Sequence, residues 1–328
     1  MKKPNKKNTS ICVVGLGYVG LPIAIEFGKY FNVIGFDVDK SRIEELNRSY
    51  DRTLEINSRE FKKSKNIKFT YNSKNIINCN VYIITVPTPV NNKKKPDIKL
   101  LKQATNLISK ALRKGDIVIY ESTVFPGCTE EVCVPLLERG SKLKYNSDFH
   151  CGYSPERIVP GDTKYKLVDI KKIVSGSNKD AALFVNSLYK KIIVAGTFQT
   201  KSIKIAEAAK VIENTQRDLN IALVNELAII FDKMNIKSSD VFDAVSTKWN
   251  ALPFRPGLVG GHCIGVDPYY LTYKSRKLNY EPKIILAGRK LNDSMASYVF
   301  KKIIEQMKLR KIKSHGSKVL VLGITFKE

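Results

Sequence analysis

The sequence predicts an α/β fold, in which an N-terminal domain with a parallel sheet precedes a helical domain. Three observations support this prediction. Short apolar runs alternate with helical patterns between Ile11 and Tyr153. A turn with three closely spaced glycines follows the first apolar run. Further along, Ser202 to Met234 contains neither proline nor glycine and repeats its apolar residues at helical spacing, so it predicts one long helix.

The first strand and helix are joined by a glycine-rich turn. Ile11 to Gly15 is an apolar run typical of a buried parallel strand, and Leu21 to Tyr30 has helical spacing. In such a unit the first glycine makes the tight turn, the second lets a pyrophosphate approach the backbone, and the third allows close helix packing. We therefore expect a Rossmann dinucleotide-binding domain. Its cofactor phosphates should lie at Gly15, Gly17, Tyr18, Val19 and Gly20.

A second apolar strand, Val33 to Phe36, ends at Asp37. A carboxylate at this position accepts hydrogen bonds from the adenosine ribose and repels a 2′-phosphate. The sequence therefore favours NAD over NADP. Lys40 and Arg42 lie close enough to Asp37 to leave NADP open.

Polar turns follow three further predicted strands, Val81 to Val86, Ile117 to Tyr120 and Phe149 to Tyr153, of which the first two flank a helix over Ile98 to Leu112. Ligands bind at the carboxyl ends of strands in open α/β sheets, although ordinary turn chemistry is the alternative. The residues of interest in these turns are Thr88, Thr123, Glu156 and Arg157.

The long predicted helix has a polar middle, in which Lys210 and Asn214 are four residues apart and share a face. It also offers a natural dimer interface. Ser239 to Val245 and Lys283 to Leu309 predict two more helices, and Arg255 lies in the irregular segment between them.

The segment Gly260 to Leu271 places Cys263 in a glycine turn, with Asp267 four residues later. A thiol with a carboxylate nearby suits covalent chemistry on a carbonyl. The alternative is a buried or incidental cysteine, because most free cysteines behave as small hydrophobes.

Composition limits the possible functions of the 328 residues, which are 43% hydrophobic and carry a formal net charge of +25. The lysines are scattered, so we treat the charge as compositional bias, although a nucleic-acid binder is an alternative. The six cysteines show no CxxC pair and the three histidines form no ligand cluster, so we expect neither disulfides nor a metal. Apart from the apolar segment around the glycine turn, no apolar run is long enough to span a membrane. We expect a cytoplasmic protein.

These motifs, in this order, resemble the UDP-glucose/GDP-mannose dehydrogenase family. Two segments are similar in sequence to the UDP-N-acetylhexosamine 6-dehydrogenases of the Vi-polysaccharide type. They are residues 153–162, YSPERIVPGD, and residues 254–271, FRPGLVGGHCIGVDPYYL. The resemblance covers essentially the whole chain. It implies that a sugar C6 alcohol is oxidised to a carboxylate with two NAD⁺ in turn, for surface polysaccharide synthesis.

The resemblance also implies roles for residues. Cys263 would form a thiohemiacetal and then a thioester. Lys210 and Asn214 would stabilise oxyanions, Asp267 and Thr123 would position water, and Glu156 would act in hydrolysis. It further implies that Thr88 and Thr123 contact the cofactor. The implied substrate-binding residues are Glu156, Arg157, Lys210, Asn214, Arg255 and Gly260. A surface guanidinium is the alternative for Arg255.

Two departures from the family pattern stand out. Pro160 occupies the position of a second glutamate in UDP-glucose members. Relatives also continue into a second Rossmann-like domain, of which we expect only the first strand, Lys318 to Leu322. We therefore predict a NAD-binding domain over 1–200, a central helical domain carrying the catalytic cysteine over 201–310, and the start of a third domain over 311–328.

Two hypotheses follow from these departures. The chain is either an active homodimeric dehydrogenase or a non-catalytic remnant that binds only NAD. The sequence does not distinguish UDP-GlcNAc from UDP-GalNAc as the substrate.

Overall fold

The computed structural model describes residues 8–158, 165–261 and 263–323. Its chain forms two compact units. The first comprises the residues up to 91 together with 96–210, and the second comprises 92–95 and the residues from 211 onwards. Pro160, the departure noted above, lies outside the described residues.

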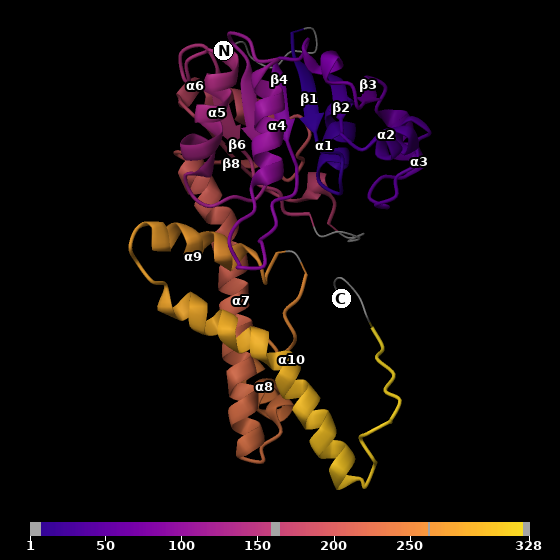
Figure 1. The fold of residues 1–328 in the computed structure, drawn as a ribbon, viewed down its shortest axis with the longest axis vertical. Coiled ribbons are helices and arrows are strands. Elements are labelled where there is room, and N and C mark those ends of the chain that lie inside the picture. The colour runs from indigo at the N-terminus through magenta and orange to yellow at the C-terminus, as the bar shows by residue number, and fades with distance from the viewer. Residues whose placement is uncertain (1–7, 159–164, 262, 324–328) are drawn as a thin grey trace. The chain divides into compact units, whose positions relative to one another are not determined.

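The first unit is built on an eight-stranded sheet with the order β3-β2-β1-β4-β5-β6-β7-β8 (Figure 1). All neighbouring strands pair in parallel except β6 and β7, which are antiparallel. The strands are β1 Ser10–Val14, β2 Asn32–Phe36, β3 Ile67–Thr70, β4 Val81–Ile84, β5 Ile117–Tyr120, β6 His150–Tyr153, β7 Lys172–Gly176 and β8 Thr197–Gln199.

Helices cover both faces of this sheet, which explains why the central strands β4 and β5 are buried at every residue. The helices of the first unit before the long one are α1 Gly20–Phe27, α2 Lys40–Asn47, α3 Ser58–Lys63, α4 Lys99–Ser109, α5 Val134–Ser141 and α6 Lys179–Tyr189. Apolar side chains of α1, α2 and α6 share one buried cluster with alternate residues of β1, β4 and β5.

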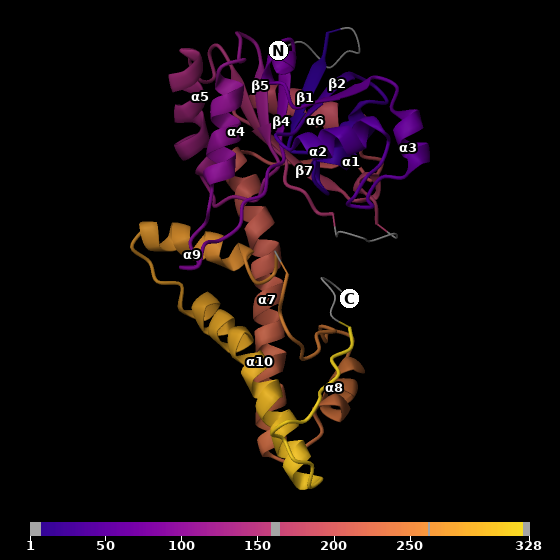
Figure 2. The ribbon, with the colours of Figure 1, turned by 45° about the vertical axis from the view of Figure 1, so that its right-hand side comes forward.

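The opposite face of the sheet carries two buried tyrosines that contact α4 and its C-terminal end. The Tyr82 hydroxyl donates to the carbonyl of Ala111 at 3.3 Å, and the Thr105 and Tyr120 hydroxyls are 3.2 Å apart. Figures 1 and 2 show α5 beside α4. Helices and loops therefore enclose the sheet on both sides, and a ligand would reach it at the turns that follow the strands.

The second unit is helical. It contains most of α7, Ile203–Lys233, together with α8 Ser238–Ser246, α9 Asp267–Lys277 and α10 Lys283–Leu309. Figure 1 shows α10 crossing α7 obliquely. A Cβ at Gly288 of α10 would lie 2.6 Å from Leu219, so the absence of a side chain there lets the two helices approach closely. Buried polar contacts also join them, such as Asn225 Nδ2 to Asn292 Oδ1 at 2.9 Å.

The structure confirms the predicted α/β class and each helix and strand predicted up to Leu309, with shifts of a few residues at their ends. It corrects two expectations. The antiparallel β7 joins a sheet that was expected to be parallel. Residues 318–322 are not a strand, because no described neighbour pairs with them and their apolar side chains are exposed.

Several elements were not predicted from the sequence, namely α2, α3, α5, α6, α9, β3, β7 and β8. In the described part of the chain, every helix is too short or too polar to cross a membrane.

We expect Gly20→Ala to lower the free energy of unfolding by about 3 kcal/mol, because overpacking a closed site forces the backbone to move. A Cβ at Gly20 would lie 1.8 Å from the carbonyl oxygen of Gly15. Gly17 offers a matched control, since a Cβ there meets nothing within 4 Å. Gly17→Ala should stay within about 0.5 kcal/mol of the wild type. Urea denaturation compares the two, and equal stabilities would contradict the close approach at Gly20.

Candidate functional site

The glycine turn after β1 is closed by the carboxylate of Asp37, the residue that follows β2. Gly15 has a φ of +94°, which favours glycine, and its N–H donates to Phe36 at 2.9 Å. The N–H of Leu16 donates to Asp37 Oδ2 at 2.7 Å. The other Asp37 oxygen accepts from the N–H of Asp39 at 3.0 Å. Asp37 thus holds the turn in place, and a carboxylate has lone pairs left for ribose hydroxyls.

Arg42 reinforces the same turn. Its Nε donates to the Leu16 carbonyl at 2.9 Å, and a terminal nitrogen donates to Asp51 Oδ1 at 2.7 Å. Only 4% of Arg42 is exposed. Arg42 was one of the two residues for which NADP remained an alternative cofactor. Its guanidinium is buried within the fold and therefore does not present its charge to a 2′-phosphate.

The turns after β4 and β5 lie against each other, as the sequence predicted from their strand-end positions. The Thr88 hydroxyl donates to the Thr123 carbonyl at 2.7 Å. The Ser122 hydroxyl donates to the Val86 carbonyl at 2.6 Å. Two of the predicted cofactor residues are thereby joined at one edge of the sheet.

Glu156, in the turn after β6, is a buried carboxyl whose pKa is raised to about 7. Burial is the main cause, because it disfavours the charged form. The cations of Lys210 and Lys172 lower this pKa, and the Glu121 carboxylate raises it. Glu156 Oε1 has no hydrogen-bond partner among the described residues. A carboxyl with a pKa near neutrality can accept and release a proton during a reaction. The adjacent Arg157 is half-buried.

The first half of α7 carries the two predicted polar residues, Lys210 in the first unit and Asn214 in the second. Both are buried, at 6% and 2% exposure. Asn214 Nδ2 donates to Asp267 Oδ2 at 2.6 Å. A polar pair this deeply buried is unusual for a helix whose only task is packing.

The cysteine turn leads directly into α9. Asp267 is the first residue of that helix, Pro268 follows within its first turn, and the N–H of Asp267 donates to the Cys263 carbonyl at 2.8 Å. Cys263 is partly exposed, whereas the other five cysteines are buried. The structure thus excludes a fully buried Cys263 and places this residue in the glycine turn. In the second unit the structure thus brings together Asn214, Asp267 and the Cys263 turn.

Arg255 and Gly260 are both exposed. The Arg255 guanidinium donates to Asp243 Oδ1 of α8 at 2.8 Å and to the Ser246 hydroxyl at 3.2 Å. Arg255 therefore forms a surface ion pair in this structure.

Glu207 on α7 was not predicted from the sequence. Its buried carboxylate accepts from the N–H groups of Gly127 at 2.5 Å and Thr129 at 2.9 Å, in the turn that follows Thr123. Burial raises the pKa of Glu207 to about 7. The only sequence signal for a buried Glu207 was its position among alanines, whose small side chains allow close packing. That signal did not indicate that Gly127 and Thr129 would be its hydrogen-bond partners.

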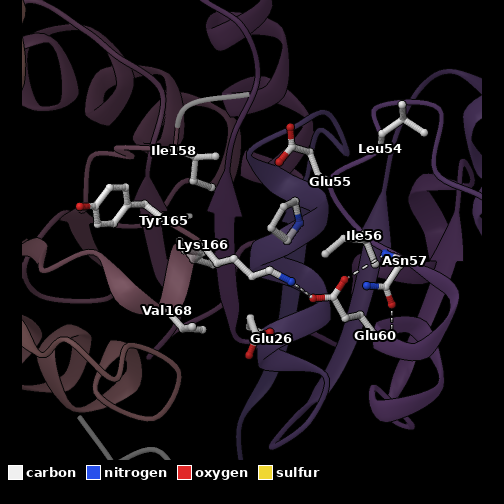
Figure 3. Close-up of a pocket in the computed structure, with 12 residues that line it drawn as sticks. Glu26, Leu54, Glu55, Ile56, Asn57, Glu60, Ile158, Tyr165, Lys166 and Val168 are labelled. Atoms are coloured by element: carbon white, nitrogen blue, oxygen red, sulfur yellow. Dashed lines mark hydrogen bonds and ion pairs between the residues drawn. The ribbon is translucent and has the colours of Figure 1, made fainter. Parts of the chain in front are cut away.

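The sequence also did not indicate a cavity of about 320 Å³ beside α1 in the first unit (Figure 3). Glu60 and Lys166, which form an ion pair at 2.8 Å, are among its lining residues. None of the predicted site residues lines it. The described residues also contain no group of three or more His, Cys, Asp or Glu placed to hold a metal ion.

The glycine turn fits the phosphates of a dinucleotide. Space is open beside Gly17, and α1 begins at Gly20 without a hydrogen bond from the side chain of its N-cap, Val19. The positive end of the helix dipole at this point favours a phosphate. The fold and this turn define the class of dinucleotide-binding α/β proteins.

The chain belongs to the UDP-glucose/GDP-mannose dehydrogenase family. The NAD binding domain of that family matches residues 9–193, and its central domain matches residues 204–294. The cofactor is therefore NAD, and the chain is an NAD-dependent dehydrogenase.

Two curated relatives are similar over almost the whole chain. The UDP-N-acetyl-D-glucosamine 6-dehydrogenase of Pseudomonas aeruginosa is 57% identical over 322 residues, which cover 98% of this chain and 76% of the relative. That of Salmonella typhi is 58% identical, with 97% and 75% covered. Among solved structures, a UDP-D-ManNAc dehydrogenase from Pyrococcus horikoshii superimposes with a TM-score of 0.86 at 32% identity, covering 93% of this chain and 73% of the other.

Glu207 should make stability depend on pH. Its pKa rises from 4.5 to about 7 on folding, so its contribution is complete below pH 4.5 and is lost as the pH rises through 7. The free energy of unfolding of the wild type, relative to Glu207→Gln, should therefore fall by about 3 kcal/mol over that interval. Denaturation of both proteins across this pH range tests the prediction. Parallel pH curves would contradict it.

Proposed function

We propose that this chain is a UDP-N-acetylhexosamine 6-dehydrogenase, which oxidises the C6 alcohol of the sugar to a carboxylate for surface polysaccharide synthesis. The observation that carries the proposal is Cys263, the partly exposed thiol in a glycine turn that is hydrogen-bonded to the start of α9. Family membership and the names of the similar relatives support this substrate class.

The reaction removes four electrons in two steps. Each oxidation transfers one hydride to NAD⁺, which is the chemistry that the cofactor supplies when bound. The first oxidation converts the alcohol to an aldehyde and releases a proton. The Cys263 thiolate then adds to the aldehyde carbon to give a thiohemiacetal. Loss of the second hydride leaves a thioester, which water hydrolyses to the carboxylate and the free thiol.

The buried polar residues would serve the charges that develop in these steps. Lys210 and Asn214 would donate to the alkoxide and tetrahedral oxyanions, since fixed donors in a dry site stabilise such charge best. Thr123 and Asp267 would position water. Glu156, with a pKa of about 7, would accept a proton from the attacking water at neutral pH.

Binding of the cofactor would use the glycine turn and the joined turns after β4 and β5. The residues proposed to hold NAD are Gly15, Gly17, Tyr18, Val19, Gly20, Asp37, Thr88 and Thr123. The residues proposed to bind the sugar nucleotide are Glu156, Arg157, Lys210, Asn214, Arg255 and Gly260. For Arg255, this role requires exchange of the Asp243 ion pair for a diphosphate, a partner that suits a guanidinium.

The predicted homodimer and the division into domains over 1–200, 201–310 and 311–328 belong to the same proposal. Sedimentation and limited proteolysis test them directly.

The function is tested by NADH formation with NAD⁺ and either UDP-GlcNAc or UDP-GalNAc, beside calorimetric NAD⁺ binding. We expect two NADH per sugar nucleotide. Binding of NAD⁺ without turnover of either sugar nucleotide would refute the proposed activity.

Cys263→Ser should stall after the first oxidation, because a serine hydroxyl lacks the thiolate character that the second step requires. We expect one NADH per substrate and no uronic acid, measured by absorbance and by mass spectrometry of the product. Cys133→Ala is the matched control, because it removes a buried thiol from another part of the fold. This variant should still form two NADH per substrate. Full carboxylate production by Cys263→Ser would remove Cys263 from the mechanism.

A further inference from the structure

A buried ion pair crosses the sheet at the end of β6. Glu121 directly follows β5, and Lys172 is the first residue of β7, so β6 lies between them. Lys172 Nζ lies 2.6 Å from Glu121 Oε2, and their side chains are only 4% and 0% exposed. The pair therefore lies beneath the point where the chain leaves β6 and turns toward Glu156.

Lys172 also holds that turn directly. Its ammonium donates a second hydrogen bond, at 3.1 Å, to the carbonyl of Pro155, the residue before Glu156. The Tyr189 hydroxyl of α6 donates to the second oxygen of Glu121, and the Lys172 ammonium lies 5.3 Å from the centre of the Tyr189 ring. Both charges are thus paired and hydrogen-bonded, as buried charges must be.

Stability alone does not account for charged residues at this place. Apolar side chains of similar volume often stabilise a core as well as a buried ion pair does. This pair instead joins two turns that carry proposed catalytic residues. Glu121 is two residues before Thr123, and Lys172 is hydrogen-bonded next to Glu156.

The charges around Glu156 also connect it to the Lys172–Glu121 pair. Lys210 faces it from α7, Lys172 from β7, Glu121 from the end of β5, and Arg157 is its neighbour in the chain. Of these, Lys172 and Glu121 form a pair of opposite charge, and they shift the proton affinity of Glu156 in opposite directions.

We propose that Lys172 and Glu121 are positioning residues for Glu156. The pair holds the Glu156 turn against the Thr123 turn and places one charge of each sign near the Glu156 carboxyl. Lys172 acts through the Pro155 carbonyl and through its charge, and Glu121 acts by holding Lys172. This inference rests on the proposed role of Glu156 in hydrolysis of the thioester.

The test measures the pKa of Glu156 directly by infrared difference titration of the full chain. The carboxyl band is assigned by its absence in Glu156→Gln. Lys172→Met should raise this pKa by about one unit and Glu121→Gln should lower it by about one unit, the order expected for removing one nearby charge. The double variant, which removes both charges, should lie closer to the wild type than either single variant. It also covers the case in which a single variant leaves an unpaired buried charge and fails to fold.

Turnover provides the second readout. Lys172→Met should lower kcat about ten-fold or more with KM little changed and should accumulate the thioester, whereas Lys172→Arg should restore much of the rate. If the wild type forms no NADH, the proposed function fails, but the infrared titration still decides the positioning role. If the variants lose stability while the Glu156 pKa stays at its wild-type value, the pair serves the fold alone and the inference is overturned.

Discussion

Parallel pairing of short apolar strands is the constraint on which the rest of the first unit depends. Because β1, β4, β5 and β6 run in one direction, their carboxyl ends meet at one edge of the sheet. Because helices cover both faces, the strands themselves tolerate few polar side chains. The glycine turn, the threonine turns and the Glu156 turn are therefore gathered where the sheet ends, and the chemistry of this unit is concentrated there.

Charged side chains then fix those turns, and apart from the half-buried Asp37 they are buried. Asp37 accepts from the N–H of Leu16 in the glycine turn, and Glu207 accepts from two N–H groups in the turn after Thr123. Lys172, paired with Glu121, holds the carbonyl before Glu156. Each of these contacts satisfies backbone groups that a turn leaves unpaired. The cost of burying a charge is offset where hydrogen bonds surround it, and the same burial raises the pKa of Glu156 and Glu207 toward neutrality.

Elements with strong periodicity were predictable from the sequence, including the long helix α7, the helix α10 and the strand β5. The observed bounds of α10 and β5 equal the predicted ones. Short, polar elements such as α3 and β8 were not, because their sequences lack a clear repeat and tertiary packing decides their structure. The apolar run at 318–322 shows the reverse case. Its composition favours a strand, but a strand needs a hydrogen-bonded neighbour, and among the described residues it has none.

The sequence by itself determined the dinucleotide-binding turn, the strand-end positions of Thr88, Thr123 and Glu156, and the family, because these depend on local spacing and residue type. Only the tertiary structure decided which charges meet. Arg42 turns inward to Leu16 and Asp51, Glu207 reaches the turn after Thr123, and Lys172 pairs with Glu121 from a strand 51 residues away. Such pairings depend on how separate strands and helices pack, and no periodicity in the chain encodes them.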